Sequence, residues 1–233
     1  MSKLSSFLKN KIINYYETST TPMKCINYLK LNYPQYNLKY DHIAFRSICN
    51  EKYDFLKNTF IQDGYHKMNT INIPLSNNDD TFKHAIWFKN QYNKIPRIFL
   101  SIGYPTSLEN YIIDSNRFSN QEKEDMLNER KDDYVKWTWL FDTEINHIAL
   151  DMSDYGDDFY KVIETMINDL NLTMNNSDNI YQISKDKKLI QCSTKADLFN
   201  NKSKNFIEFV RRIDNRDGFE GDNAAVIFES TKY

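Results

Sequence analysis

The stretch that decides the fold lies near the end of the chain and reads Asn205-Phe-Ile-Glu-Phe-Val-Arg-Arg-Ile-Asp-Asn-Arg-Asp-Gly-Phe-Glu-Gly-Asp-Asn-Ala-Ala-Val-Ile-Phe-Glu-Ser-Thr231. Its apolar residues from Phe206 to Val210 predict a strand that lies between other strands. Glu208 stands in the middle of this run, and burying a carboxylate is costly unless it is paired or binds a metal. The stretch therefore predicts one wall of a metal site, closed by a Gly-bearing loop and a short helix. A Glu on the wet face of an edge strand is the alternative.

Two further strand-like runs each carry a histidine in the same local context. They read Tyr40-Asp-His42-Ile-Ala-Phe-Arg46 and Ile145-Asn-His147-Ile-Ala-Leu-Asp151. Two histidines and one carboxylate form the facial ligand set of non-heme Fe(II) oxygenases, which leaves positions open for substrate and O2. Each histidine taken alone is more simply a buried structural residue, but its repetition at matching positions disfavours that interpretation.

The two histidines mark an internal repeat with a separation of 105 residues. Each is followed by the pattern of a helix and then of three strands. The predicted elements are strand 40–47, helix 51–62 and strands 65–74, 81–88 and 95–102, then strand 145–152, helix 157–170 and strands 180–184, 188–194 and 205–211. Self-similarity of this kind reveals architecture. The sequence predicts an α+β fold in which two βαβββ modules face each other around one barrel-like metal cavity.

The rest of the chain is arranged around these modules. We expect a single catalytic domain, with N-terminal helices in residues 1–35 packed on the outside of the main fold. The first module covers 40–102, a helical insert covers 105–142, and the second module with its closing loop and helix covers 144–231. A helix at about 121–139 is expected within the insert, because a capping box opens it.

Side chains on a strand alternate faces, so residues four apart point the same way. His42 and Arg46 therefore share one side, as do His147 and Asp151. If that side faces the cavity, Arg46 presents a planar fork suited to a substrate carboxylate. A structural ion pair of Arg46 with Asp41 or Asp151 is the alternative.

Other polar residues are weaker candidates. Gln191 and Ser193 end an apolar strand and could hydrogen-bond a substrate, and ordinary strand-end polarity explains them equally well. His84 lies on an expected strand, where it lines the cavity or serves packing. His66 follows a turn and is expected to be exposed.

Composition excludes several classes of protein. The 30 basic and 32 acidic residues leave a formal net charge of -2, which does not favour nucleic-acid binding. The three cysteines form neither a disulfide framework nor a zinc cluster, so a reducing, cytoplasmic compartment is expected. No apolar run approaches the length of a membrane span, so no membrane partner is expected.

Six motifs in order resemble one known family, the 2-oxoadipate dioxygenase/decarboxylases of the vicinal oxygen chelate superfamily. The resemblance spans about residues 40–231. The motifs are Asp41-His-Ile-Ala-Phe-Arg46, Pro96-Arg-Ile-Phe-Leu-Ser101, Asn146-His147, Gln191-Cys-Ser-Thr-Lys-Ala-Asp197, Phe206-Ile-Glu-Phe-Val-Arg-Arg212 and Asp217-Gly-Phe-Glu with Ile227-Phe-Glu-Ser-Thr231. Longer members carry a C-terminal region absent here, which leaves the exact substrate open.

The resemblance implies Fe(II) bound by His42, His147 and Glu208, with Arg46 holding a substrate carboxylate. It implies conversion of 2-oxoadipate and O2 to 2-hydroxyglutarate and CO2, in a lysine-degradation context. The alternatives are a 2-oxo-acid oxygenase similar to 4-hydroxyphenylpyruvate dioxygenases and a metal-binding member without turnover. A glyoxalase-type isomerase is disfavoured, because it would not need a ligand set suited to O2 chemistry.

Overall fold

The fold is described from a computed structural model of the 233-residue chain. The residues that the structure describes are 5–48, 51–73, 82–90, 95–104, 137–138, 141, 143–175, 179–184, 187–199 and 202–213. The closing loop and helix expected after residue 213, and almost all of the helical insert, lie outside these residues.

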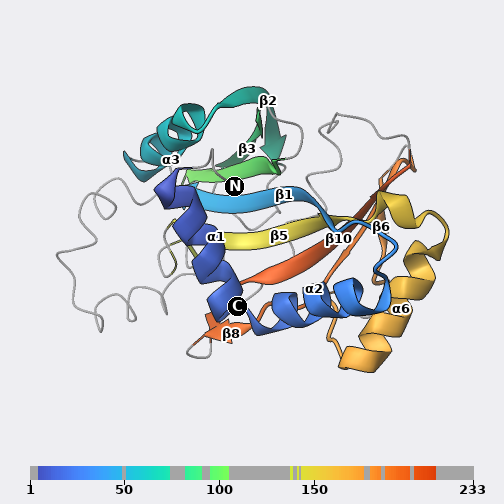
Figure 1. The fold of residues 1–233 in the computed structure, drawn as a ribbon. Coiled ribbons are helices and arrows are strands. Elements are labelled where there is room, and N and C mark those ends of the chain that lie inside the picture. The colour runs from blue at the N-terminus through green and yellow to red at the C-terminus, as the bar shows by residue number, and fades with distance from the viewer. Residues whose placement is uncertain are drawn as a thin grey trace.

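One mixed sheet of eight strands forms the centre of the molecule (Figure 1). Its spatial order is β2-β3-β4-β1-β5-β10-β7-β6. The strands are β1 (Lys39–Ile48), β2 (Tyr65–Ile73), β3 (Phe82–Asn90), β4 (Arg97–Tyr104), β5 (Ile145–Asp151), β6 (Gln182–Ile183), β7 (Leu189–Ser193) and β10 (Phe206–Arg212). Among the described residues, β2 and β6 form its two edges, so the sheet is open rather than closed into a barrel.

The two halves of the sheet have the same topology. In each half the first strand pairs with the last strand in parallel, β1 with β4 and β5 with β10. The remaining pairs, β4 with β3, β3 with β2, β10 with β7 and β7 with β6, are antiparallel. The halves meet at the antiparallel pair of β1 and β5. This is the predicted pair of βαβββ modules, joined through their first strands.

Helices cover one face of the sheet. They are α1 (Ser6–Thr18), α2 (Thr20–Asn32), α3 (Glu51–Gln62) and α6 (Asp158–Leu170), which follows a 3-10 turn, η2 (Ser153–Tyr155). Leu8, Ile26, Leu56, Phe60 and Phe159 are at most 1% exposed and belong to one core cluster with the sheet residues that point toward the helices. The N-terminal helices therefore pack on the outside of the sheet, as expected from the sequence.

The other face of the sheet carries a smaller cluster. Its members alternate with the core residues along each strand, as the period of a strand requires; they are Ala44, Ala85, Trp87, Phe99, Ala149, Leu189 and Val210. Three of the seven are alanines. Small side chains between larger ones leave room above this face for the polar residues described below.

Some local features go beyond the predictions. The first helix ends at Thr18 and the second begins at Thr20, so Pro22 lies inside the first turn of α2. Proline is tolerated there because the amide that it lacks has no partner within the helix. Phe55 on α3 is 50% exposed and packs edge-on against Phe7 of α1. A short hairpin of β8 (Leu198–Phe199) and β9 (Lys202–Ser203) was not predicted.

Candidate metal centre

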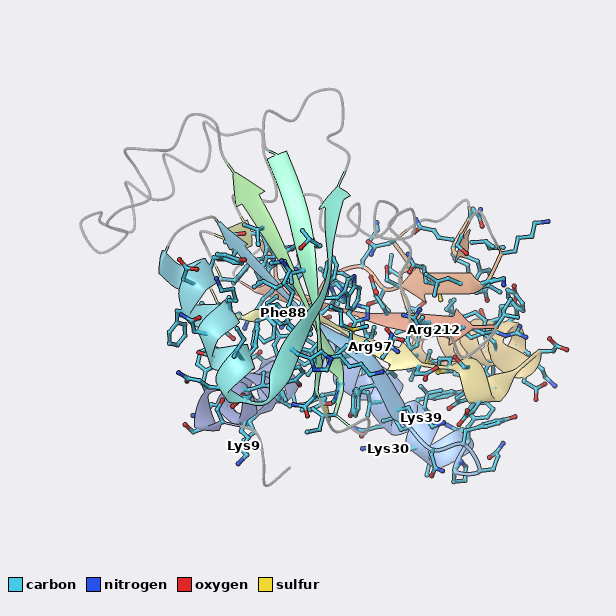
Figure 2. All side chains as sticks on the ribbon, turned by 90° about the horizontal axis from the view of Figure 1, so that it is seen from above. Lys9, Lys30, Lys39, Phe88, Arg97 and Arg212 are labelled. Carbon is cyan, nitrogen blue, oxygen red and sulfur yellow. The ribbon has the colours of Figure 1, made fainter. Side chains whose placement is uncertain are left out.

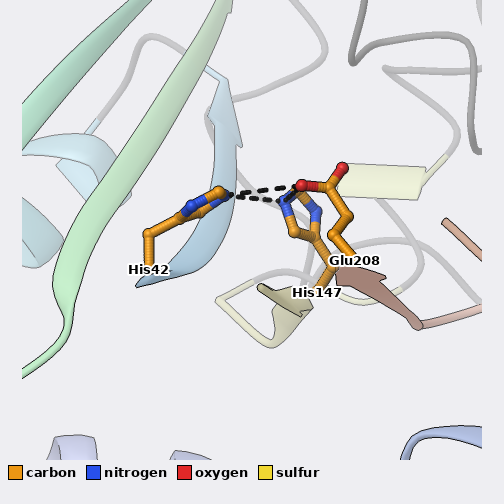
Figure 3. A group of neighbouring side chains, drawn as sticks. All are labelled: His42, His147 and Glu208. Atoms are coloured by element: carbon orange, nitrogen blue, oxygen red, sulfur yellow. Dashed lines mark hydrogen bonds and ion pairs between the residues drawn. The ribbon is translucent and has the colours of Figure 1, made fainter. Parts of the chain in front are cut away.

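Three predicted ligands converge on the face of the sheet opposite the helices (Figure 3). His42 lies on β1, His147 on β5 and Glu208 on β10, so the group spans three adjacent strands and both modules. Nε2 of His42 lies 3.2 Å from Nε2 of His147, and Oε2 of Glu208 lies 3.8 and 3.6 Å from these two nitrogens. Ligands bound at right angles to one first-row ion lie about 3 Å apart. The spacing therefore suits one ion held by three atoms.

The hydrogen bonds on the far side of each ring orient these nitrogens. Nδ1 of His42 lies 2.9 Å from Oδ1 of Asp41, and Nδ1 of His147 lies 2.9 Å from Oδ1 of Asn146. An oxygen acceptor places the proton of a neutral imidazole on Nδ1 and leaves a lone pair on Nε2. The two lone pairs face each other at 3.2 Å and repel. A cation between them removes that repulsion.

Burial favours the neutral form of both histidines. Burial lowers the pKa of His42, although Asp41 opposes the change. Burial, His42 and Arg46 together lower the pKa of His147 well below its usual value. Because neutral imidazole is the form that binds metals, both rings are ready to act as ligands near neutral pH.

Glu208 also behaves as a group that awaits a cation. The residue is 3% exposed, and its Oε2 has no hydrogen-bond partner among the described residues. Burial raises the pKa of its carboxyl to about 8, with a further contribution from Asp41, while Arg46 opposes the change. A buried carboxylate oxygen without a partner is costly. Two imidazole nitrogens and this oxygen are a donor set that fits a divalent first-row metal.

Aromatic rings hold the histidines from the sides. The ring centroid of Trp87 lies 5.0 Å from that of His42 at an interplanar angle of 84°, and Phe99 lies 6.1 Å away. Phe206 lies 4.5 Å from His147. These rings pack against the two imidazoles, and His42 and His147 are 1% and 3% exposed.

Arg46 lies on the same face of β1 as His42, as the alternation predicted. It is 4% exposed, and its guanidinium carbon lies 5.6 Å from the ring centroid of Trp137. Trp137 is fully buried and donates from Nε1 to the backbone oxygen of Lys204 at 2.6 Å. The charge of Arg46 lowers the pKa of both His147 and Glu208.

Gln191 and Ser193 lie on β7, directly opposite Val210 and Glu208 of β10, and so share the face of the triad. Gln191 is 6% exposed, and its Oε1 has no hydrogen-bond partner among the described residues. Ser193 accepts a hydrogen bond from Asn175 Nδ2 at 2.9 Å. Whether either residue binds a substrate stays a prediction.

Asp41 is a residue whose role the sequence did not reveal. Arg212 donates to it from Nε at 2.7 Å and from Nη2 at 3.0 Å, and Arg97 Nη1 lies 4.0 Å from its Oδ2. Both arginines are labelled in Figure 2. Burial alone raises the pKa of Asp41, but Arg212 and His42 outweigh it and hold the pKa well below its usual range. The sequence signal available was its position directly before a repeated histidine, which Asn146 shares.

The chain has two further histidines. His66 is exposed, as expected. The side chain of His84 lies outside the described ones. Asp151 accepts hydrogen bonds from Ser153 at 2.9 Å (N) and 2.5 Å (Oγ), at the far end of β5.

Comparison with known proteins gives the fold a context. No protein-family model matches the chain, and no curated protein matches it in sequence. A hydroxyglutarate synthase from Oryza sativa, solved in complex with 2-oxoadipate, has a TM-score of 0.72 at 21% identity, covering 96% of this chain and 90% of that one. A glyoxalase superfamily protein from Ralstonia eutropha has a TM-score of 0.63 at 13% identity, covering 90% and 83%. A variant of 4-hydroxymandelate synthase from Streptomyces coelicolor has a TM-score of 0.54 at 14% identity, covering 83% and 54%.

At identities this low the likeness shows the fold alone, which is the vicinal oxygen chelate fold that the sequence predicted. Activities differ among proteins that share a fold, so function has to be argued from the site. Among the described residues, no helix combines the length and the apolar character needed to cross a membrane.

Proposed function

We propose that this protein acts as a single catalytic domain, a Fe(II)-dependent dioxygenase and decarboxylase of a 2-oxo dicarboxylic acid. The first candidate substrate is 2-oxoadipate. The observation that carries the proposal is the buried convergence of His42, His147 and Glu208 within 4.8 Å of one another. The likeness in fold to a hydroxyglutarate synthase solved with 2-oxoadipate supports the choice of substrate.

Three protein ligands on one side of an ion leave the other side for small molecules. Fe(II) held there would supply the electrons with which O2 is activated beside a chelating 2-oxo acid. The protein's own part is to hold three donors in place and to exclude water through Trp87, Phe99 and Phe206. A dry site also keeps a reactive intermediate from side reactions.

Arg46 is assigned to the distal carboxylate of the substrate. Its buried guanidinium lies over Trp137 and influences the pKa of both His147 and Glu208, so its charge acts within the same dry space as the triad. A guanidinium binds a carboxylate through two parallel hydrogen bonds, which fixes orientation as well as charge. Gln191 and Ser193, on the same face, would hydrogen-bond the bound acid.

The overall reaction balances without a second organic substrate. One 2-oxoadipate and one O2 yield one 2-hydroxyglutarate and one CO2. The substrate loses the carboxylate beside its 2-oxo group as CO2, and the two electrons released by that cleavage go to O2. The other two electrons that O2 requires come from the C–H bond that is converted to the C–OH bond. One oxygen atom of O2 enters the shortened carboxylate and the other becomes the new hydroxyl group.

An aromatic 2-oxo acid is the second candidate, because the walls around the histidines are aromatic. Trp87 and Phe99 pack against each other with ring centroids 4.6 Å apart beside His42. The likeness in fold to 4-hydroxymandelate synthase points the same way. A substrate such as 4-hydroxyphenylpyruvate would stack on these rings, and Arg46 would contribute less to its binding because it has no distal carboxylate.

The test is oxygen uptake by the purified protein after anaerobic loading with Fe(II). The panel contains 2-oxoadipate, an uncharged 2-oxo acid of similar length and 4-hydroxyphenylpyruvate, with CO2 and hydroxy acid measured as products. We expect uptake and CO2 in equal amounts with 2-oxoadipate. The Zn(II)-loaded protein is the control, since zinc has no redox chemistry. Stoichiometric iron without uptake on any 2-oxo acid would identify a metal-binding protein without this activity.

A cytoplasmic location also stays a prediction. A reducing compartment keeps iron as Fe(II) and keeps the buried thiols of Cys25 and Cys192 reduced.

A further inference from the structure

Each strand that carries a histidine contains an extra residue directly before it. On β1, Tyr40 pairs with Leu150 and His42 pairs with Ala149, so Asp41 has no partner of its own across the ladder. This is a β-bulge, in which two residues of one strand oppose one residue of the other.

The second bulge belongs to β5. Ala44 pairs with His147 and Phe45 pairs with Ile145, so Asn146 is the extra residue. The two bulges lie in one antiparallel ladder, one on each strand, and each directly precedes a histidine of the triad. The repeat thus includes the bulge as well as the histidine.

The bulges explain an arrangement that a regular strand forbids. Adjacent side chains of a regular strand point to opposite faces, so Asp41 could not reach the ring of His42. The bulge turns the preceding side chain, and its oxygen then lies 2.9 Å from Nδ1 of the histidine in both modules. Bulges are found next to active sites, where they redirect side chains in this way.

The two oxygens differ in charge. Asp41 provides a carboxylate, whose two oxygens also accept hydrogen bonds from Arg212 at 2.7 and 3.0 Å. Asn146 provides a neutral amide, and its Nδ2 has no hydrogen-bond partner among the described residues. Both bonds to Nδ1 have the same length, so the charge of the acceptor distinguishes these two bonds, and Arg212 and Arg97 partly offset that charge at His42.

We propose that Asp41 is a positioning residue, which fixes the proton of His42 on Nδ1 and makes His42 the stronger of the two imidazole donors. Through Arg212, which lies four residues beyond Glu208 on β10, it also links the His42 and Glu208 ligands across β5. A carboxylate that accepts the distal N–H of a ligand histidine raises the basicity of that ligand. The inference rests on the metal centre proposed above.

A purely structural ion pair between Asp41 and Arg212 is the competing interpretation. Such a pair would join β1 to β10 equally well without any bond to the imidazole. The structure instead places the bulge so that Oδ1 of Asp41 serves both His42 and Arg212. The experiment must therefore separate the effect on the ring from the effect on stability.

The first measurement uses the wild-type chain without metal. Nitrogen-15 NMR of the imidazoles, assigned with His66→Gln, His84→Gln and His147→Gln variants, reports which nitrogen carries the proton. We expect both His42 and His147 to be protonated on Nδ1, with the His42 proton further downfield because its acceptor is charged. A proton on Nε2 of His42, or equal shifts for the two Nδ1 protons, overturns the proposal.

The second measurement compares Co(II) affinity of metal-free Asp41→Asn with that of the wild type by absorption titration. The change gives His42 a neutral amide as its acceptor, as Asn146 does for His147, and we expect Co(II) binding to be about 10- to 100-fold weaker. Asp154→Asn is the matched control, because Asp154 pairs with Lys39 at 2.6 Å on the surface of the protein. That variant should bind Co(II) as the wild type does.

The NMR signals of Asp41→Asn distinguish positioning from simple loss of structure. The Nδ1 proton of His42 should move upfield while that of His147 stays in place. Unchanged Co(II) affinity, or equal shifts at both rings, contradicts the proposal. If wild-type protein binds no Co(II) or Fe(II), the proposed function fails, whereas the wild-type proton positions still decide the role of Asp41.

Discussion

The two modules share one topology but contribute unequally to the candidate metal centre. Each presents a histidine on its first strand, His42 on β1 and His147 on β5. On the last strand of each module, one residue pairs with that histidine. Two residues beyond this partner, the second module carries Glu208 and the first module carries Phe99. The duplicated backbone therefore offers four equivalent positions around the centre, and the sequence uses three of them for ligands.

The difference explains how a symmetric backbone can produce an open coordination site. Phe99 fills the fourth position with an apolar ring that packs against His42 and Trp87. A phenyl ring offers no donor atom to an ion, so this position is left to exogenous ligands. A carboxylate there would be a fourth protein ligand, and a six-coordinate ion would then have too few positions for a chelating 2-oxo acid and O2 together. The choice at this one position separates a site that can take O2 from one that cannot.

The largest expected effect comes from replacing Glu208, which stands in the second module where Phe99 stands in the first. Glu208→Ala should abolish binding of one metal equivalent, because two neutral imidazoles alone hold a divalent ion weakly. Phe99→Ala changes the matching position of the other module and should retain the metal. Metal content after dialysis measures both. Full iron content and turnover in Glu208→Ala would show that Glu208 is not a ligand.

The converse change tests whether the fourth position governs reactivity. Phe99→Glu supplies the first module with the carboxylate of the second, so metal should be retained while oxygen uptake is lost. Phe99→Leu is the matched control, since it keeps the position apolar and should keep most of the uptake. Oxygen uptake at equal metal content measures the effect. Undiminished oxygen uptake by Phe99→Glu would contradict the idea that Phe99 keeps a coordination position open.

A third equivalent pair lies four residues beyond each histidine, where the first module carries Arg46 and the second carries Asp151. Arg46→Lys keeps the charge but loses the two-pronged geometry. A hydrogen bond to a charged group contributes about 1.5–3 kcal/mol, so kcat/KM for 2-oxoadipate should fall roughly 10- to 200-fold with iron content unchanged.

The control for that change is an uncharged 2-oxo acid of similar length, on which the loss should be small. An equal loss on both substrates, or no loss on either, would mean that Arg46 does not bind the distal carboxylate. Steady-state kinetics at matched iron content provide the comparison.

The smallest expected effect concerns the stability of the metal-free protein. Glu208→Gln should raise the free energy of unfolding at pH 7.5 by about 1–3 kcal/mol, because glutamine does not ionise in the unfolded chain as Glu208 does. The pKa of Glu208 is raised from 4.5 to about 8, so the folded protein holds a proton that the unfolded chain releases between these values. Wild-type stability should therefore decline as pH rises through that window.

Urea denaturation in the presence of a chelator, at pH 5 and at pH 7.5, measures this effect. The variant should gain more at pH 7.5 than at pH 5. Equal free energies of unfolding of the two proteins at both pH values would show that Glu208 does not destabilise the metal-free protein. Addition of metal should stabilise only the wild type.

Much of this arrangement was predictable because it is periodic. The strands and helices of both modules follow from alternation and from helical spacing, as with α3, whose predicted bounds of 51–62 match Glu51–Gln62. The convergence of His42, His147 and Glu208 followed from the repeat and from a carboxylate within an apolar strand. Such signals are local, and burial on one face imposes them.

The bulges and the ion pair could not be predicted in the same way. Alternation places Asp41 on the face opposite His42, and only the pairing of β1 with β5 shows that it is an extra residue. The Arg212–Asp41 ion pair joins residues 171 apart in sequence, and nothing local marks Arg212 as its partner. The Trp137 contact with Arg46 likewise joins the helical insert to the first module.

The pairing of β1 with β5 also bears on how the chain folds. The ligands from its two strands are 105 residues apart, so the loop that must close before they meet is long. Contacts of such high sequence separation form slowly, because the entropy of closing the loop is lost before the contact stabilises anything. Each module can form its own parallel pair earlier, without the other. The metal centre thus arises only when the halves dock, and metal-sensitive absorption in a refolding experiment would time that last step.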